Sequence, residues 1–406
     1  MLELEVSPRD RDLLASHGTQ MGEAYDLYLR ARGYLQDYDS PENIERAIAD
    51  FQRALVLDPN YVLAYAGLGS AYWRKYESSK QAEWINTGRQ NCEHAVALEA
   101  KTSAGHICLG TFDNGTGRYE KAAAQFQKAL DAEPTNDEAY RGLARAEERL
   151  GRMTDAEKTY RRAIALRPHY WAGYNWLGHL YSDEARYPEA IAQFQQALTL
   201  SPENGRLYYS MGGVYILMGR YQEAISALKK SIELRPAFEA YSNLGQAYFG
   251  LRRFDDAITA FEQVNRLGAL HHSAVGNLAR AYYFAPGKRA QAREIYQRAI
   301  RMAEEQLKVN ANDSDTHIML ADYNAMLGKR SQAFLHLQRA LGLRPNDPEI
   351  LFFAAVVHNQ FGEREQALNW LQKSAARGYS RAQIEAAVEL DNLRNEARFK
   401  SAIQPR

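Results

Sequence analysis

The residue types that carry catalysis or bind metals occur in this sequence without the spacing that either function needs. Gly110 to Arg118 reads GTFDNGTGR, but it lacks the lysine and the preceding strand of a phosphate-binding loop, so we interpret it as a turn. His271 and His272 are adjacent, and the other histidines have no partner four residues away and no cysteine pair. No serine or cysteine has the glycine-flanked setting of a nucleophile. The sequence therefore predicts no catalytic residue, no metal site and no cofactor, and hence no enzyme.

Charge and cysteine content narrow the possible partners and the compartment. The chain carries 50 lysines and arginines against 50 aspartates and glutamates, so we expect no nucleic-acid partner. The N-terminus lacks the apolar core of a secretory signal, and no stretch approaches the length of a membrane span, so we expect no membrane insertion. Cys92 and Cys108 have no zinc-ligand spacing and are too few for a disulfide framework, and we interpret both as free, buried thiols. These features predict a cytoplasmic protein in a reducing compartment, or a soluble fragment of a larger one.

A fixed period organises the chain. Pro134, Pro168, Pro202 and Pro236 follow one another at intervals of 34 residues. Counting from the third residue after each proline, position 4 is tyrosine in three successive units, and positions 8, 20 and 27 hold small residues. Positions 4, 7, 8 and 11 lie on one helical face, as do positions 20, 24 and 27, so each unit is expected to be two helices. The proline ends the second helix, and glycine near position 15 reverses the chain between the two.

These residues resemble the tetratricopeptide repeat, whose W/Y-x2-L-G-x2-Y, A-x3-F-x2-A and proline positions they match. The resemblance implies an all-α fold, a right-handed α-solenoid superhelix of about ten helix-turn-helix repeats with a C-terminal capping helix. It divides the chain into an N-terminal linker or cap (1–22), the repeat array (23–381) and a C-terminal capping segment (382–406). We expect the repeats to start near residues 23, 62, 103, 137, 171, 205, 238, 272, 314 and 348.

Two repeats depart from the period of 34. Residues 62–102 carry an insertion of about seven residues around KYESSKQAEW, and residues 272–313 are expected to have a second helix that is longer by about two turns. The lengthened repeat followed by LDNLRNEARF resembles the tail region of certain bacterial multidomain regulators. In those proteins the repeats follow a kinase, cyclase or winged-helix DNA-binding domain.

In the tetratricopeptide fold, the first helix of each repeat lines a concave groove with positions 2, 5, 6, 9, 12 and 13. The side chains at these positions are amides, aromatics and arginines, which together suit an extended peptide. A further apolar stretch includes Met319, Phe352 and Phe353. The predicted ligand-binding residues are Arg141, Arg145, Arg149, Asn175, Trp176, His179, Tyr209, Asn243, Gln246, Phe249, Asn277, Arg280 and Tyr283.

The leading interpretation is a non-enzymatic scaffold that binds a protein or peptide in this groove. Because Arg141, Arg145 and Arg149 share one helical face, we expect the bound segment to carry acidic residues or a free carboxylate near Arg145. The alternative is the regulatory or sensory portion of a bacterial signalling protein, whose groove contacts an output domain that this sequence does not include.

Overall fold

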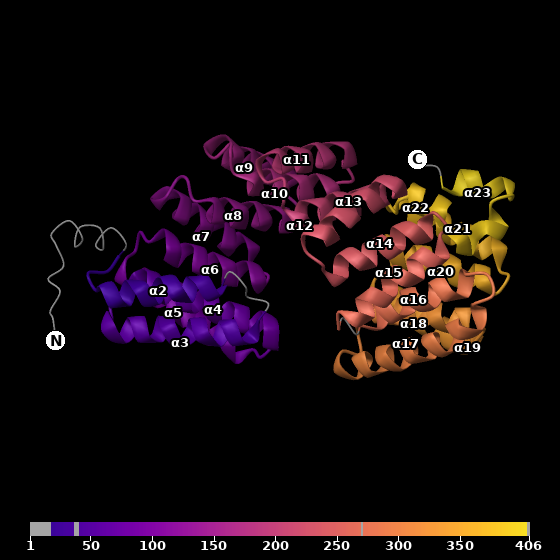
Figure 1. Ribbon diagram of the computed structural model, residues 1–406, viewed down its shortest axis with the longest axis horizontal. Helices are drawn as coiled ribbons and strands as arrows, with labels where there is room; N and C mark the ends of the chain where they lie inside the picture. The colour runs from indigo at the N-terminus through magenta and orange to yellow at the C-terminus, as the bar shows by residue number, and fades with distance from the viewer. Residues whose placement is uncertain (1–17, 36–39, 269–270, 404–406) are drawn as a thin grey trace. The chain divides into compact units, whose positions relative to one another are not determined.

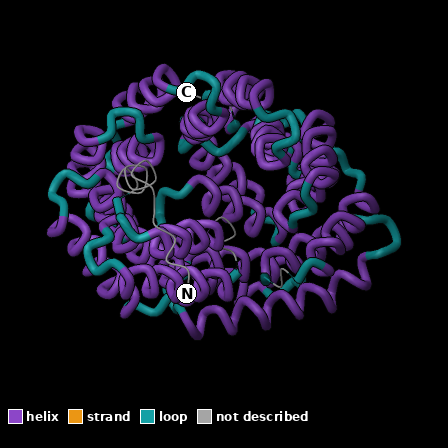
Figure 2. The backbone as a smooth tube through the Cα atoms, turned by 60° about the vertical axis from the view of Figure 1, so that its left-hand side comes forward, coloured by secondary structure: helices purple, strands orange, loops and turns teal. Residues whose placement is uncertain are grey.

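The computed structural model describes residues 18–35, 40–268 and 271–403, and most of the predicted N-terminal segment 1–22 lies outside them. Throughout these residues, helices are joined by short loops and no strand is present (Figure 2). The predicted all-α solenoid class is confirmed. The chain divides into two compact units, Met1–Leu180 and Tyr181–Arg406, called here the N-terminal and the C-terminal unit. Their boundary falls inside one helix, α10.

The N-terminal unit is built from consecutive helical hairpins (Figure 1). Its helices are α2 (Gly22–Tyr34), α3 (Pro41–Leu57), α4 (Val62–Ser79), α5 (Glu83–Leu98), α6 (Ser103–Gly115), α7 (Tyr119–Ala132), α8 (Asp137–Arg149), α9 (Met153–Leu166) and the greater part of α10 (Trp171–Asp183).

The C-terminal unit continues with hairpins of the same kind. They are formed by α11 (Tyr187–Leu200), α12 (Gly205–Leu217), α13 (Tyr221–Leu234), α14 (Phe238–Gly250), α15 (Phe254–Arg266), α16 (His272–Phe284), α17 (Arg289–Val309), α18 (Ser314–Met326), α19 (Arg330–Leu343), α20 (Pro348–Gln360) and α21 (Arg364–Ala376). Three short helices follow: α22 (Arg381–Ala386), the 3-10 helix η2 (Val388–Leu393) and α23 (Ala397–Ala402). The C-terminal segment is thus three short helices, where the sequence indicated one capping helix.

Local sequence sets the ends of these helices. Asn136 caps α8 by accepting a hydrogen bond from the backbone N–H of Ala139 at 3.0 Å, and Asp347 caps α20 in the same way. The turn inside most hairpins needs a left-handed residue, which is glycine at Gly151 (φ 72°) and Gly328 (φ 72°). Arg252 adopts the same conformation, with φ 60°, at the corresponding place between α14 and α15. A non-glycine residue there costs about 1 kcal/mol or more.

Small residues on the second helices allow the close packing that the period predicts. Ala156, Ala190, Ala197 and Ala224 are all fully buried. The helix α17 has 21 residues, against 14 in α11 and α13, which gives the lengthened second helix that the sequence indicated. The insertion in the repeat at 62–102 mainly lengthens both of its helices, because α4 and α5 have 18 and 16 residues.

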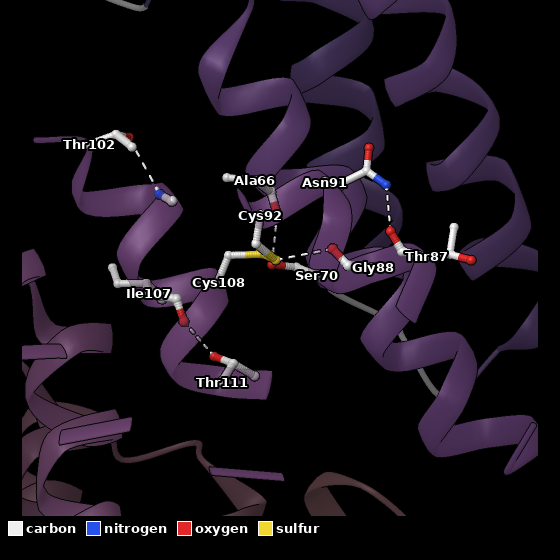
Figure 3. Close-up of a disulfide and its surroundings, with 11 residues drawn as sticks. Ala66, Ser70, Thr87, Gly88, Asn91, Cys92, Thr102, Ile107, Cys108 and Thr111 are labelled. Carbon is white, nitrogen blue, oxygen red and sulfur yellow. Dashed lines mark hydrogen bonds between the residues drawn. A yellow bond between two sulfur atoms is a disulfide. The ribbon is translucent and has the colours of Figure 1, made fainter. Parts of the chain in front are cut away.

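The prediction of free thiols is wrong. Cys92 of α5 and Cys108 of α6 form a disulfide (Figure 3). The two helices pack side by side and bring the Cα atoms to 5.6 Å, inside the range that a disulfide spans. Both sulfur atoms lie against Gly69 of α4, where any Cβ would come within 2.6 Å of them. Because disulfides are rare in reducing compartments, the expected reducing environment no longer follows from the cysteines.

Reduction of this disulfide is expected to destabilise the N-terminal unit by about 3 kcal/mol, the loss of loop-closure entropy for a loop of this length. The sequence separation is 16 residues and both cysteines are buried. The measurement is urea unfolding with and without a reductant, with thiol titration of the denatured protein to count free cysteines. The double variant Cys92→Ala, Cys108→Ala serves as the control, since its midpoint should not respond to reductant. Two titratable thiols in the untreated parent would contradict the bond itself.

Candidate functional site

Three predicted arginines lie exposed along α8 in the N-terminal unit. Arg141 makes a 3.5 Å ion pair with Glu138, and its guanidinium lies 5.9 Å from the ring centre of Trp176. Arg145 and Arg149 form no ion pair within the part of the chain that the structure describes. Two cationic groups are therefore available to an incoming carboxylate on this helix.

Aromatic side chains border the arginines. Trp176 of α10 lies 6.3 Å from the ring centres of both Tyr160 and Tyr170. The hydroxyl of Tyr160 donates to Glu148 of α8 at 2.9 Å, and burial raises the pKa of Tyr160. Glu148 is thereby bound to its own repeat. We call the surface formed by the exposed Arg141, Arg145 and Arg149 and the half-buried Trp176 the arginine face.

Two other predicted residues of the N-terminal unit lie nearby on α10. Asn175 is buried, and its side-chain oxygen Oδ1 has no hydrogen-bond partner among the described residues. His179 is exposed. The buried position of Asn175 fits helix packing better than contact with a ligand from solvent.

Four predicted residues of the C-terminal unit line one cavity of about 400 Å³. They are Gln246 and Phe249 of α14 and Asn277 and Arg280 of α16. Tyr209 and Asn243 lie outside it. Tyr283 also lies outside, and its hydroxyl accepts hydrogen bonds from Arg289 and, at 3.3 Å, from Gln360.

The remaining walls of the cavity come from the helices α12 to α16, from the later α18 and α20, and from the C-terminal segment. Its lining also includes Ile216, Tyr221, Ser242, Gly250, Phe261, Ser273, Met319, Glu349, Phe352, Phe353, Tyr379, Gln383, Ala386, Ala387 and Glu389. A second cavity of about 410 Å³, beside His271 and His272, shares Ser273, Met319 and Glu349 with the first.

Arg280 is the charged centre of the first cavity. Its Nη2 donates to Oδ2 of Asp322 at 2.7 Å, and its Nε lies 3.4 Å from Oε1 of Glu389. The exposed fractions of the three side chains are 17%, 0% and 6%. Burial alone would lower the pKa of Arg280, but the two carboxylates raise it above its ordinary value. Arg280, which the sequence analysis predicted to bind a ligand, is therefore already paired with two carboxylates of its own chain.

The segment Tyr379–Leu393, called here the strap, crosses from the last repeat back to earlier ones. Ser380 donates to the carbonyl oxygen of Leu217 at 2.7 Å, and α22 lies beside the α12–α13 hairpin (Figure 1). Asp391 accepts two hydrogen bonds of 2.6 Å from Arg252, the residue with the left-handed backbone. The strap thus carries Glu389 to Arg280 and forms one wall of the cavity.

Sequence reasoning missed four residues of this site. Glu349 and Asp322 stand at positions 2 and 9 of their repeats, which are groove positions, so the repeat register could have found them. Tyr379 and Glu389 belong to a segment without the repeat pattern, and no spacing pointed to them.

The chain resembles known repeat proteins over much of its length. Sequence models of the tetratricopeptide repeat match residues 41–75, 115–170, 172–237, 206–267 and 242–307, together more than half of the chain. Among solved structures, MamA is 28% identical over 39% of this chain and 93% of its own, with a TM-score of 0.35.

Two further solved structures are tetratricopeptide-repeat proteins. One from Parabacteroides merdae is 15% identical, covering 64% of this chain and 99% of that one, with a TM-score of 0.46. One from Thermus thermophilus is 25% identical, covering 44% and 98%, with a TM-score of 0.38. In the part of the chain that the structure describes, no helix has the length and apolar character needed to cross a membrane.

Proposed function

Because this chain belongs to the tetratricopeptide-repeat family, we propose that it is a non-enzymatic scaffold that binds a segment of another protein. The observation that supports this most is the arginine face. Arg145 and Arg149 are exposed and without an ion-pair partner among the described residues, and Trp176 offers an aromatic surface beside Arg141. Arginine and a large aromatic residue are the side chains that contribute most to protein–protein binding.

The chemistry of this face favours a ligand with acidic residues or a free carboxylate near Arg145. Arginine binds carboxylates through paired hydrogen bonds, and exposed charges attract an oppositely charged peptide less strongly as salt rises. The arginine face belongs wholly to the N-terminal unit, so this proposal does not depend on the cavity of the other unit.

The test measures fluorescence anisotropy of labelled acidic peptides, each with a free or an amidated C-terminus, and of neutral peptides of equal length. Binding is expected to favour the acidic peptides and to weaken with salt. The variant Arg145→Glu should lose about tenfold in affinity, about 1.4 kcal/mol. The control Arg162→Glu changes an exposed arginine on the second helix of the same repeat and should bind as the parent does.

Equal binding of acidic and neutral peptides, or equal losses in Arg145→Glu and Arg162→Glu, would show that the ligand uses another surface. If the chain is instead the regulatory portion of a bacterial signalling protein, the face contacts an output domain and free peptides show no acidic preference. The cytoplasmic location stays a prediction, and the disulfide between Cys92 and Cys108 weighs against it.

A further inference from the structure

We propose that the cavity of the C-terminal unit is a binding site for a small organic cation, a guanidinium or primary ammonium group. The proposal is independent of peptide binding by the arginine face, because every lining residue belongs to the C-terminal unit. The volume of about 400 Å³ lies within the range of small-molecule sites.

The charges around the cavity are unbalanced toward the negative. The lining contains one basic side chain, Arg280, and two carboxylates, Glu349 and Glu389. Among the described residues, Arg280 is the only base paired with Glu389, and it is shared with the fully buried Asp322. The single positive charge of Arg280 is thus shared by the two buried carboxylates, and Glu349 is a third acidic side chain nearby.

Glu389 is the side chain that most strongly favours a cationic ligand. It lines the cavity and is only 6% exposed, and the distance of 3.4 Å to Arg280 is longer than that of a charge-assisted hydrogen bond. A buried carboxylate with an incomplete partner gains free energy from a second cation. Glu349 also lines the cavity and is open to solvent, so it adds a second carboxylate that a cation can reach.

The other walls fit the delocalised charge and the N–H groups of a guanidinium. The rings of Phe352 and Tyr379 stack with centres 4.5 Å apart, and the guanidinium of Arg280 already lies 5.2 Å from the ring centre of Phe353. Aromatic faces attract cations, and the side-chain amides of Gln246 and Asn277 can accept hydrogen bonds from N–H donors. A ligand carboxylate would meet Glu349 and Glu389 and be repelled.

The strap makes the site complete. Glu389 and Tyr379 come from the strap, and the paired hydrogen bonds between Arg252 and Asp391 hold it in place. The site therefore exists only in a chain whose C-terminal segment is bound to its own repeats.

The experiment is calorimetric titration of the full chain with butylguanidinium and with butylurea, a neutral ligand of nearly the same shape. Butylguanidinium is expected to bind at least about tenfold more tightly. A second titration compares two tripeptides with acetylated and amidated ends: Gly-Arg-Gly, which carries a guanidinium group, and Gly-citrulline-Gly, which carries the neutral urea group. Tighter binding of the arginine tripeptide than of butylguanidinium assigns the cation to a protein side chain, and the reverse assigns it to a free small molecule.

Glu349→Gln and Glu389→Gln are each expected to weaken butylguanidinium binding about tenfold. Glu385→Gln is the matched control, since Glu385 lies on the strap outside the cavity and pairs with Arg381 at 2.8 Å. Circular dichroism identifies any variant that has lost its fold. If Glu389→Gln does not fold, Glu349→Gln alone tests the proposal. Equal binding of the charged and neutral ligands, no binding of butylguanidinium, or equal losses in Glu349→Gln and Glu385→Gln would overturn the proposal.

Discussion

Replacing Arg280 with methionine is expected to destabilise the C-terminal unit by about 3–5 kcal/mol, because it leaves two buried carboxylates without their cation. Asp322 is fully buried and its Oδ1 already lacks a hydrogen-bond partner among the described residues. The measurement is urea unfolding followed by circular dichroism. Arg252→Met is the matched control: it also removes an arginine bound to the strap, but from a pair whose side chains are 46% and 37% exposed. That pair should contribute about 1 kcal/mol or less.

The pH dependence of Arg280→Met gives a second, independent readout. Burial raises the pKa of Glu389 above its ordinary value of 4.5, and loss of Arg280 raises it further. The folded variant therefore binds a proton more readily than the unfolded chain does. The free energy of unfolding of Arg280→Met is lower than that of the parent at neutral pH. This difference should shrink as the pH falls from neutrality toward 4.5 and grow again as the pH rises. If the difference in unfolding free energy is the same at neutral pH and at pH 4.5, lost packing and not unpaired charge causes it.

Phe126→Ala is expected to destabilise the N-terminal unit by about 3–5 kcal/mol through the cavity that it leaves. Phe126 of α7 is buried, and its ring lies between two glycines of the neighbouring helices. A Cβ placed at Gly110 would come within 2.8 Å of this ring, and one at Gly142 within 2.2 Å. The ring thus occupies the space that the two missing side chains provide.

A double-mutant cycle with Gly142→Ala tests this packing directly. In the parent, the added methyl group meets the ring of Phe126 and should destabilise the protein. In Phe126→Ala the same methyl group enters empty space, so its cost should fall or reverse. Additive effects of the two changes in urea unfolding would show that Phe126 and Gly142 do not share one space.

The repeat spacing predicted the helices well because a helical period is a local property of the sequence. The helices that begin at Asp137, Trp171 and Gly205 each start at the third residue after a proline, as the interval of 34 predicts. The same period assigns Asn277 and Arg280 to the groove face of α16, and that assignment stays a prediction. Both residues do line the cavity.

What the period could not predict is pairing between distant segments. Nothing in the spacing of Arg280 indicates that Glu389, more than a hundred residues later, reaches it. The bond between Cys92 and Cys108 likewise depends on how α5 packs against α6 beside Gly69, which the spacing of the two cysteines does not show. Local patterns thus predicted the helices, but not which charged side chains neutralise one another.

The strap also changes how the C-terminal unit should fold and come apart. Repeats that contact only their neighbours unfold from their ends, one hairpin after another. Here Ser380 is bonded to Leu217 across 163 residues and Asp391 to Arg252 across 139, so the last segment closes a loop on the earlier hairpins. Closing so long a loop has a large entropic cost. The contacts of the strap offset this cost only when the intervening hairpins are folded. The hairpins between α12 and the strap should therefore open together, and amide hydrogen exchange there should show one common protection in place of a gradient toward the C-terminus.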